Sequence, residues 1–298
     1  MCPRSPKRKS EAPRSMITRG SRPLSKRSPS DGVLISVVTV VLNGRDKIEK
    51  TIGSVSSQDY KRVEYIVIDG GSTDGTLDIL KKHEIQINRW ISEPDKGISD
   101  AFNKGIHLAK GDLIGILNAG DWYEPDTLSS IAEAFRSHPD VDVFCGSIQL
   151  WEADSPALLC YSDPQLLDEE TSVYHPTVFI KRASYLKYGI YDEGLRYAMD
   201  YELLLRFNRQ GAKFLNLEKT LANMRLEGIS YKNWYAGLKE VRDARSKYFG
   251  AANVATYHSL AVLKNLLAFA LKKSGLGILY RAHWSFRNKR TVARLSRG

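Results

Sequence analysis

The stretch Leu113 to Leu128, LIGILNAGDWYEPDTL, decides the fold, because an apolar run stops abruptly at a polar cluster. Leu113 to Leu117 is almost continuously apolar, as in a strand covered on both faces in a parallel sheet. Asn118 and Asp121 follow the expected strand end, and Pro125 suits the first turn of a helix. Ligands of open α/β sheets bind outside the carboxyl ends of strands. Alone, these residues would more often form only a turn, so the interpretation depends on the other strands.

Two earlier strands are predicted to end in the same way. Val33 to Leu42 is rich in β-branched residues and stops at Asn43, which starts a turn. Val63 to Ile68 runs directly into Asp69 and the loop GGSTDG, and Leu77 to His83 then has a helical pattern. That loop matches neither the dinucleotide fingerprint nor the phosphate loop of nucleotide-binding proteins. Repeated strand, loop and helix units predict a right-handed, mostly parallel sheet.

The third strand, Asn88 to Ser92, is followed by a cluster of polar residues around a helix start. Asp95 lies in the sequence EPDKG, and Asn103 lies in the predicted helix Ile98 to Ala109. Asp100 is interpreted as a structural residue, because an acid in a first helical turn often acts only as a cap or dipole partner.

The rest of the chain alternates between further predicted strands and helices. In order, they are a helix over Pro125 to Ser137, a strand over Val141 to Cys145, an acidic loop over residues 152–170, an interrupted strand over Val173 to Lys181, a helix over Met199 to Gln210, a strand over Ala212 to Leu217, and helices over 232–250 and 254–273. His175 precedes Pro176, which indicates an edge or bulge. A lone histidine is more often structural, so the sequence does not single out His175 as catalytic.

The net charge of +10 over 298 residues comes from the two ends of the chain. Residues 1–30 and 272–298 each carry a net charge of +8, which leaves −6 for residues 31–271. An acidic body with basic tails argues against nucleic acid as a partner, and favours tails that meet an anionic surface or stay solvated. Residues 1–30 are expected to form a disordered arm. The three cysteines lack metal-ligand spacing and suit a reducing compartment, so we expect a cytoplasmic location.

Five segments occur in an order and spacing that carry a family resemblance. They are the first strand ending at Asn43, IDGGSTDGT, EPDKGISDAFNKGI, LNAGDWYEP and MDYELLLR. Together they resemble family 2 glycosyltransferases, over about Ile35 to Ser230. The resemblance implies an α/β protein with a GT-A-like, mixed and mostly parallel sheet flanked by helices. The expected organisation is a basic arm (1–30), a glycosyltransferase domain (31–230) and a helical, basic C-terminal extension (231–298).

The resemblance also implies which residues bind a nucleoside-diphosphate sugar. Asp69 should hydrogen-bond the nucleobase, and the other side chains expected to contact this donor are Asn43, Asp95, Asn103 and Asn118. Asp121 should hold Mg²⁺ or Mn²⁺ on the diphosphate. The sequence departs from the family pattern, because Gly70 replaces a second acid and Asp121 is the only carboxylate of its cluster. The ion is therefore expected to arrive largely with the nucleotide. Phe102 occupies the position where an arginine is common in the family, so the contact that this arginine would make is lost.

The segment MDYELLLR matches the family segment that carries the general base, which implies this role for Asp200. Glu202 is the competing candidate, but residues two apart on a helix do not share a face. Only one of the two should therefore face the ligand.

The sequence is compatible with three functions. The first is an inverting glycosyltransferase that acts on a glycan or lipid-linked acceptor in polysaccharide assembly. The second is a sugar nucleotidyltransferase, although no glycine-rich basic loop follows Leu34. The third is a non-catalytic nucleotide-sugar-binding relative, which the reduced acid cluster would suit. An amphipathic helix and a basic aromatic tail over Leu260 to Arg297 further predict peripheral contact with an anionic membrane.

Overall fold

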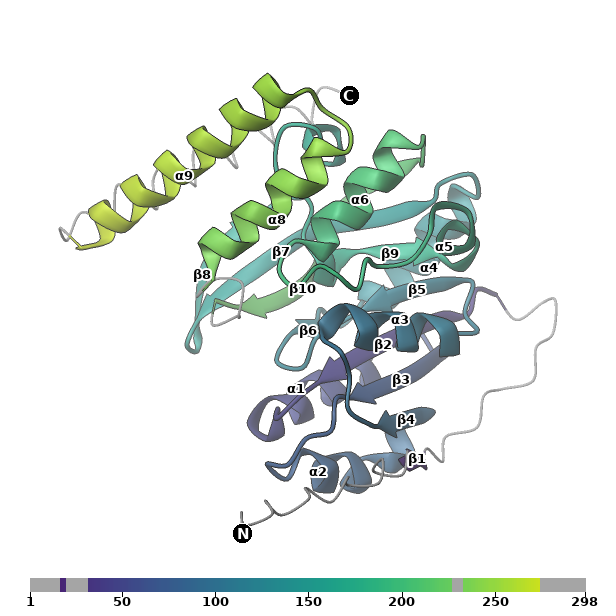
Figure 1. Cartoon of the computed structure of the whole chain (residues 1–298). Helices are drawn as coiled ribbons and strands as arrows, with labels where there is room; N and C mark the ends of the chain where they lie inside the picture. The colour runs from purple at the N-terminus through teal and green to yellow at the C-terminus, as the bar shows by residue number, and fades with distance from the viewer. Residues whose placement is uncertain (1–16, 20–31, 227–232, 274–298) are drawn as a thin grey trace, which may run out of the picture.

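The computed structural model describes residues 17–19, 32–226 and 233–273, drawn in colour in Figure 1. The strands are β1 (Ile17–Arg19), β2 (Ile35–Val41), β3 (Val63–Asp69), β4 (Arg89–Ser92), β5 (Leu113–Ile116), β6 (Trp122–Tyr123), β7 (Val143–Glu152), β8 (Ser155–Cys160), β9 (Phe179–Lys181) and β10 (Phe214–Arg225). The α-helices are α1 (Arg45–Ser56), α2 (Thr76–Lys82), α3 (Ile98–Leu108), α4 (Thr127–Ser137), α5 (Arg182–Tyr188), α6 (Met199–Arg209), α8 (Trp234–Ser246) and α9 (Ala251–Lys273). Short 3₁₀ turns are η1 (Glu84–Gln86), η2 (Pro164–Leu166) and η3 (His175–Thr177).

One mixed sheet runs through the molecule in the order β1-β4-β3-β2-β5-β9-β7-β10-β6, with β8 paired to β7. Strands β4, β3, β2 and β5 are mutually parallel, and β7 pairs in parallel with β10. Strand β9 lies antiparallel between β5 and β7. The predicted α/β class with a mixed sheet is confirmed, although antiparallel pairings slightly outnumber parallel ones.

Helices cover both faces of the sheet, and alternation along the strands divides the core into two layers. In β2, Val38 and Val40 belong to one apolar cluster, with residues of α3, α5, α6 and α8. Ile35 and Val37 belong to the other, with residues of α1, α2 and α4. Successive side chains of a strand point to opposite faces, so both faces of β2 are buried. Figure 1 shows α8 and α9 at the opposite end of the molecule from α2.

Three segments differ from their predicted structure. Ile17–Arg19, expected within a disordered arm, forms β1 and pairs with β4. Residues 152–170, expected to be a loop, include β8, which a tight turn at Ala153 (φ 51°) folds back onto β7. Strand β10 continues to Arg225, eight residues beyond its predicted end at Leu217. Polar residues interrupt its apolar pattern, but pairing with β7 carries the strand onward through two register shifts.

The two predicted C-terminal helices are present as α8 and α9. Among the described residues, no helix combines the length and the apolar character needed to cross a membrane. Most of the predicted basic tail, residues 274–298, lies outside the described residues.

Candidate active site

Five of the predicted site residues gather at one edge of the sheet. The carboxyl ends of β4, β3, β2 and β5 are neighbours, because these strands are adjacent and parallel. Asp95 follows β4, Asp69 ends β3, Asn43 follows β2, and Asn118 and Asp121 follow β5. This arrangement gives the edge a fixed order of polar groups, from Asp95 to Asp121.

Asn43 and Asp69 organise the loop after β3. Asp69 is fully buried, and its Oδ2 accepts hydrogen bonds from the backbone of Gly71 (3.1 Å) and Ser72 (3.0 Å) and from the hydroxyl of Ser92 (2.7 Å). Its Oδ1 is buried without a hydrogen-bond partner. Asn43 has a left-handed backbone (φ 50°), which asparagine tolerates well. Its N–H donates to Ser72 Oγ at 2.7 Å, so it ties the turn after β2 to the same loop. Nucleobase contact by Asp69 stays a prediction.

Asp95 lies directly over Gly70. A β-carbon at position 70 would be 2.3 Å from Asp95 Oδ2, so only glycine leaves room for this carboxylate. Asp95 Oδ1 accepts the N–H of Gly97 at 3.0 Å. Burial raises the pKa of Asp95 above its ordinary value, while the Gly97 N–H opposes the shift. The carboxylate of Asp95 thus occupies the space beside Asp69 that a side chain at position 70 would need.

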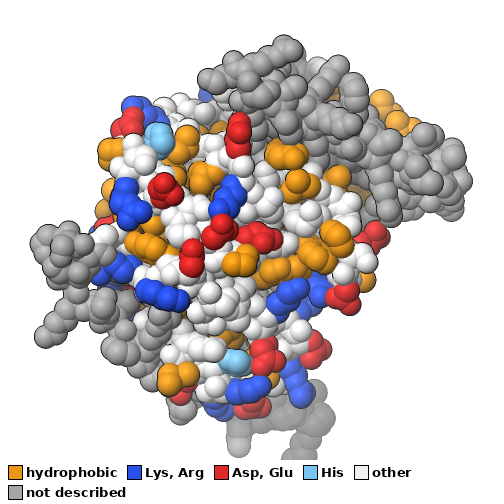
Figure 2. All heavy atoms as spheres, turned by 180° about the vertical axis from the view of Figure 1, so that it is seen from behind, with side chains coloured by type: hydrophobic (Ala, Val, Ile, Leu, Met, Phe, Trp, Pro, Cys, Tyr) orange, Lys and Arg blue, Asp and Glu red, His pale blue; other side chains and the backbone are white. Residues whose placement is uncertain are grey.

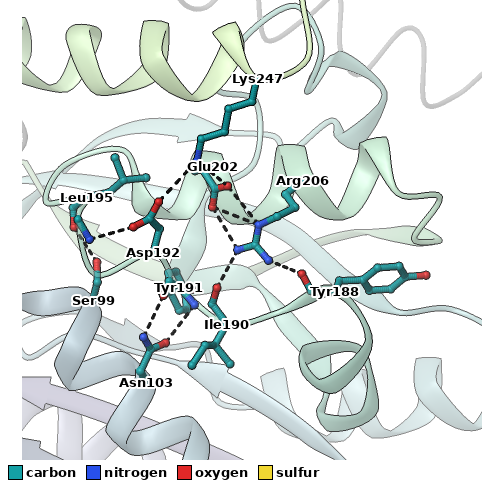
Figure 3. A network of polar contacts seen from close by, with 11 residues as sticks. Ser99, Asn103, Tyr188, Ile190, Tyr191, Asp192, Leu195, Glu202, Arg206 and Lys247 are labelled. Atoms are coloured by element: carbon teal, nitrogen blue, oxygen red, sulfur yellow. Dashed lines mark hydrogen bonds and ion pairs between the residues drawn. The ribbon is translucent and has the colours of Figure 1, made fainter.

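Asn103 makes structural contacts. Its Nδ2 donates to the carbonyl of Tyr191 at 2.9 Å, and its Oδ1 accepts the N–H of Tyr191 at 3.0 Å (Figure 3). The side chain is 3% exposed. Asn103 therefore attaches α3 to the segment before α6, and its predicted contact with the donor stays a prediction.

Asp121 is a buried carboxylate held in a tight corner. Its backbone N–H donates to Asn118 at 3.0 Å, and its carbonyl accepts the Thr51 hydroxyl at 2.8 Å. Burial raises the pKa of the Asp121 carboxyl well above its ordinary value, and the positive charge of Lys47 partly offsets the shift. Within the described ranges, no group of three or more His, Cys, Asp and Glu side chains could hold a metal ion. A single carboxylate fits Mg²⁺ or Mn²⁺ delivered by a diphosphate, since Mg²⁺ is usually bound by one or two carboxylates plus substrate phosphates.

Asp200 lies in the first turn of α6 and faces His175. Asp200 Oδ2 is 3.4 Å from His175 Nδ1, and His175 Nε2 is 2.9 Å from Asn118 Nδ2. The three side chains form a row from the end of β5 to α6. Tyr185 and Tyr191 also lie near Asp200, and the pKa of each phenol is raised, chiefly by burial and further by the charge of Asp200.

Glu202, the competing base candidate, belongs to a separate network. It is 2% exposed, and its Oε2 accepts a hydrogen bond from Arg206 Nη2 at 3.1 Å. Lys247 lies 3.6 Å from its Oε1. Figure 3 shows Arg206 between Glu202 and the carbonyls of Tyr188 and Ile190. The predicted separation of Asp200 from Glu202 therefore agrees with their contacts.

The start of α6 is capped by a distant residue. Glu240, on α8, accepts backbone hydrogen bonds from Arg196 (3.0 Å), Tyr197 (2.7 Å) and Ala198 (2.8 Å). A helix leaves its first N–H groups unsatisfied and favours negative charge there, so Glu240 stabilises the turn that carries Asp200.

Among the residues that the sequence did not single out are His175, which contacts Asn118 and Asp200, and Glu240, which binds the segment that leads into α6. The interruption of a predicted strand by His175 and Pro176 was the available signal for the first. No sequence pattern marks Glu240, because its partners are backbone groups more than 40 positions earlier.

The chain is similar to known glycosyltransferases. The family model described as Glycosyl transferase family 2 matches residues 36–158. An uncharacterized glycosyltransferase of Mycobacterium tuberculosis is 34% identical over 179 residues, which cover 58% of this chain and 68% of that protein. A putative teichuronic acid biosynthesis glycosyltransferase of Bacillus subtilis is 28% identical, over 69% of this chain and 85% of that protein.

Solved structures share the fold at low sequence identity. The mannosyltransferase PcManGT from Pyrobaculum calidifontis, in complex with GDP-Man and Mn²⁺, has a TM-score of 0.61 at 16% identity, and the match covers 88% of this chain and 84% of that chain. S. aureus TarS 1-349, in complex with UDP-GlcNAc, has a TM-score of 0.58 at 16% identity, covering 77% and 71%. The arrangement of the sheet and its helices is therefore that of the GT-A fold.

Proposed function

The chain belongs to family 2 of the glycosyltransferases, and on this premise we propose that it transfers a sugar from a nucleoside-diphosphate donor to a hydroxyl group, with inversion. The observation that carries this proposal is the row formed by Asn118, His175 and Asp200. It connects the sheet edge where the donor would bind to a carboxylate that can act as a base.

Asp200 supplies the base in the proposed reaction. A sugar hydroxyl is a weak nucleophile at neutral pH, so a nearby carboxylate must take its proton as the new bond forms. The oxygen attacks the anomeric carbon from the face opposite the diphosphate, which leaves with its bonding electrons. This single displacement inverts the anomeric centre and needs no covalent sugar intermediate.

The donor can be identified by a thermal-shift screen of nucleotide sugars with and without Mn²⁺. Only ligands that bind the folded state raise the melting temperature, so the donor should give a concentration-dependent increase. Purified protein should then transfer its sugar, or slowly hydrolyse it when no acceptor is present. Binding without either reaction would favour a non-catalytic relative.

We propose that Asp121 holds Mg²⁺ or Mn²⁺ together with the donor diphosphate. The ion would supply positive charge to the leaving diphosphate. Support comes from the burial of this carboxylate and from the Mn²⁺ named in the PcManGT complex. Because the chain supplies only one carboxylate, the ion and nucleotide should bind more tightly together than separately.

Asp121→Ala is expected to abolish the effect of Mn²⁺ on nucleotide binding. UDP and GDP serve as probes, and their dissociation constants are measured with and without the ion by calorimetry. Asp78→Ala is the matched control, since its side chain is 79% exposed on α2. Undiminished dependence on Mn²⁺ in Asp121→Ala would remove the assignment of Asp121 to the metal.

We propose a glycan or lipid-linked acceptor in polysaccharide biosynthesis. Support comes from relatives, since the B. subtilis protein is named for teichuronic acid biosynthesis. A chondroitin synthase of Escherichia coli is 29% identical over 65% of this chain, although the match covers only 29% of that protein. Nucleic acid is not proposed as a partner, because acidic and basic side chains are interspersed on the face of the molecule that Figure 2 shows.

Contact with an anionic membrane is proposed for α9 and the basic residues that follow, at the cytoplasmic surface. Four leucines on one side of α9 are exposed: Leu260 (60%), Leu263 (63%), Leu266 (53%) and Leu267 (58%). Residues 272–298 carry eight Lys or Arg and no acid. Each basic residue near an anionic leaflet contributes about 1 kcal/mol, so charge and apolar contact together suffice for reversible binding.

Replacing Leu263 and Leu267 by glutamine is expected to reduce sedimentation of the full-length protein with anionic liposomes. The charges of the tail remain in this variant, so the loss reports the apolar contact of α9. Leu186→Gln is the matched control, because Leu186 is 83% exposed on α5. Binding of the unsubstituted protein should also weaken as salt screens the charges. Equal sedimentation of all three proteins would contradict the membrane proposal.

A further inference from the structure

His175 lies between Asn118, at the edge of the sheet where the donor is proposed to bind, and Asp200, the proposed base. It lies in η3, just before β9, and β9 pairs with β5. This pairing brings His175 next to Asn118, which follows β5. The side chains of His175 and Asp200 are only 19% and 22% exposed. The row is therefore partly shielded from water.

The contacts of His175 define which ring nitrogen carries the proton. In this orientation of the Asn118 amide, Nδ2 is a donor only, so His175 Nε2, 2.9 Å away, is the acceptor. A neutral imidazole then has its proton on Nδ1, which faces Asp200 Oδ2 at 3.4 Å. Catalytic hydrogen bonds are often long in ligand-free structures and shorten when the substrate binds.

The two carboxylate oxygens of Asp200 differ in their accessibility. Oδ1 is buried and has no hydrogen-bond partner, so Oδ2 is the carboxylate oxygen that can meet an acceptor hydroxyl. It is the same oxygen that His175 faces. The imidazole therefore lies against the oxygen that would take the proton, while the Tyr191 phenol also contacts this carboxylate.

We propose that His175 is a positioning residue that holds Asp200 Oδ2 toward the acceptor and is itself oriented by Asn118. This inference rests on the proposed function. In the transfer step, the acceptor O–H bond breaks and its proton goes to Asp200 Oδ2. The acceptor oxygen bonds to the anomeric carbon as the bond to the diphosphate oxygen breaks. His175 keeps its proton throughout.

The first test compares three substitutions at position 175, with the donor found by the thermal-shift screen. His175→Ala should lower kcat on the order of 10²-fold, the cost of a misplaced catalytic group, and leave donor affinity unchanged. His175→Asn should recover much of the loss, because its amide N–H can occupy the place of Nδ1. His175→Gln places its amide near Nε2 and should recover little. A purely structural role would lower the melting temperature without this difference between Asn and Gln. Equal rescue by both, or a normal kcat in His175→Ala, would overturn the proposal.

A double-mutant cycle with Asp200→Asn tests whether the two residues act together. If His175 acts through Asp200, His175→Ala should lower kcat little further once Asp200 is Asn, because residues acting as a unit are non-additive. Loss of turnover in Asp200→Asn with full activity in His175→Ala would reject only the positioning role. Full activity in Asp200→Asn would reject the base and the positioning role together.

Nitrogen NMR of the His175 imidazole reports its tautomer and does not depend on enzyme activity. The Nδ1–H tautomer is expected for His175 in the ligand-free protein at neutral pH, and Asn118→Ala should reduce its population. An Nε2–H tautomer in the unsubstituted protein would contradict the inferred hydrogen-bond row.

Discussion

Asp200→Asn is expected to lower turnover by about 10²- to 10⁴-fold, the usual contribution of general base catalysis, while the donor still binds. Asparagine is almost isosteric with aspartate but cannot accept the proton from the sugar hydroxyl. The measurement is kcat with a saturating donor and acceptor, together with the dissociation constant of the donor. Asp243→Asn is the matched control, because Asp243 is 61% exposed on α8.

The structure separates this expectation from a helix-capping role. Asparagine caps helices nearly as well as aspartate, so a capping residue would tolerate the change. In α6 the residue at the cap position is Ala198, without a side-chain cap, and Glu240 accepts the N–H groups of Ala198 and the two residues before it. Near-normal turnover in Asp200→Asn would exclude Asp200 as the base.

Arg206→Ala is expected to reduce the free energy of unfolding by about 3–5 kcal/mol, because it leaves a buried carboxylate without its partner. Glu202 is 2% exposed, and Arg206 also donates to the carbonyl of Ile190 at 2.7 Å. Lys247, 3.6 Å from Glu202, is half exposed and would replace only part of the lost interaction. Urea unfolding monitored by tryptophan fluorescence measures the change.

Two comparisons strengthen this prediction. Replacing both Glu202 and Arg206 by methionine should cost less than Arg206→Ala, because no unpaired charge is then buried. Lys82→Ala is the surface control, since Lys82 and Glu49 form an exposed pair worth at most about 1 kcal/mol. A loss below 1 kcal/mol in Arg206→Ala would show that Glu202 is accommodated without its partner.

The sequence predicted which polar residues gather at the edge of the sheet, because the end of each strand can be recognised from the residues next to it in the chain. Asn43, Asp69 and Asn118 each come directly after a largely apolar run, and the buried parallel strands that such runs form end at the same side of a sheet. The side chains therefore gather at this edge whatever the details of packing.

Contacts between distant segments could not be predicted in the same way. Asn103 hydrogen-bonds the backbone of Tyr191, 88 positions later, and neither residue type in the sequence indicates that the other is its partner. His175 meets Asp200 only after β9 has inserted beside β5. Strand β10 is longer than its apolar pattern because pairing with β7 stabilises its polar middle. In each case tertiary packing outweighs local preference.

The cap from Glu240 makes α6 depend on a part of the chain far beyond the region that the family model matches, which ends at residue 158. Cutting the chain before α8 would leave three backbone N–H groups just before α6 without this acceptor and weaken the entry into the turn that holds Asp200. Through Glu240, α8 thus stabilises the segment that leads into α6, on which the proposed base Asp200 lies.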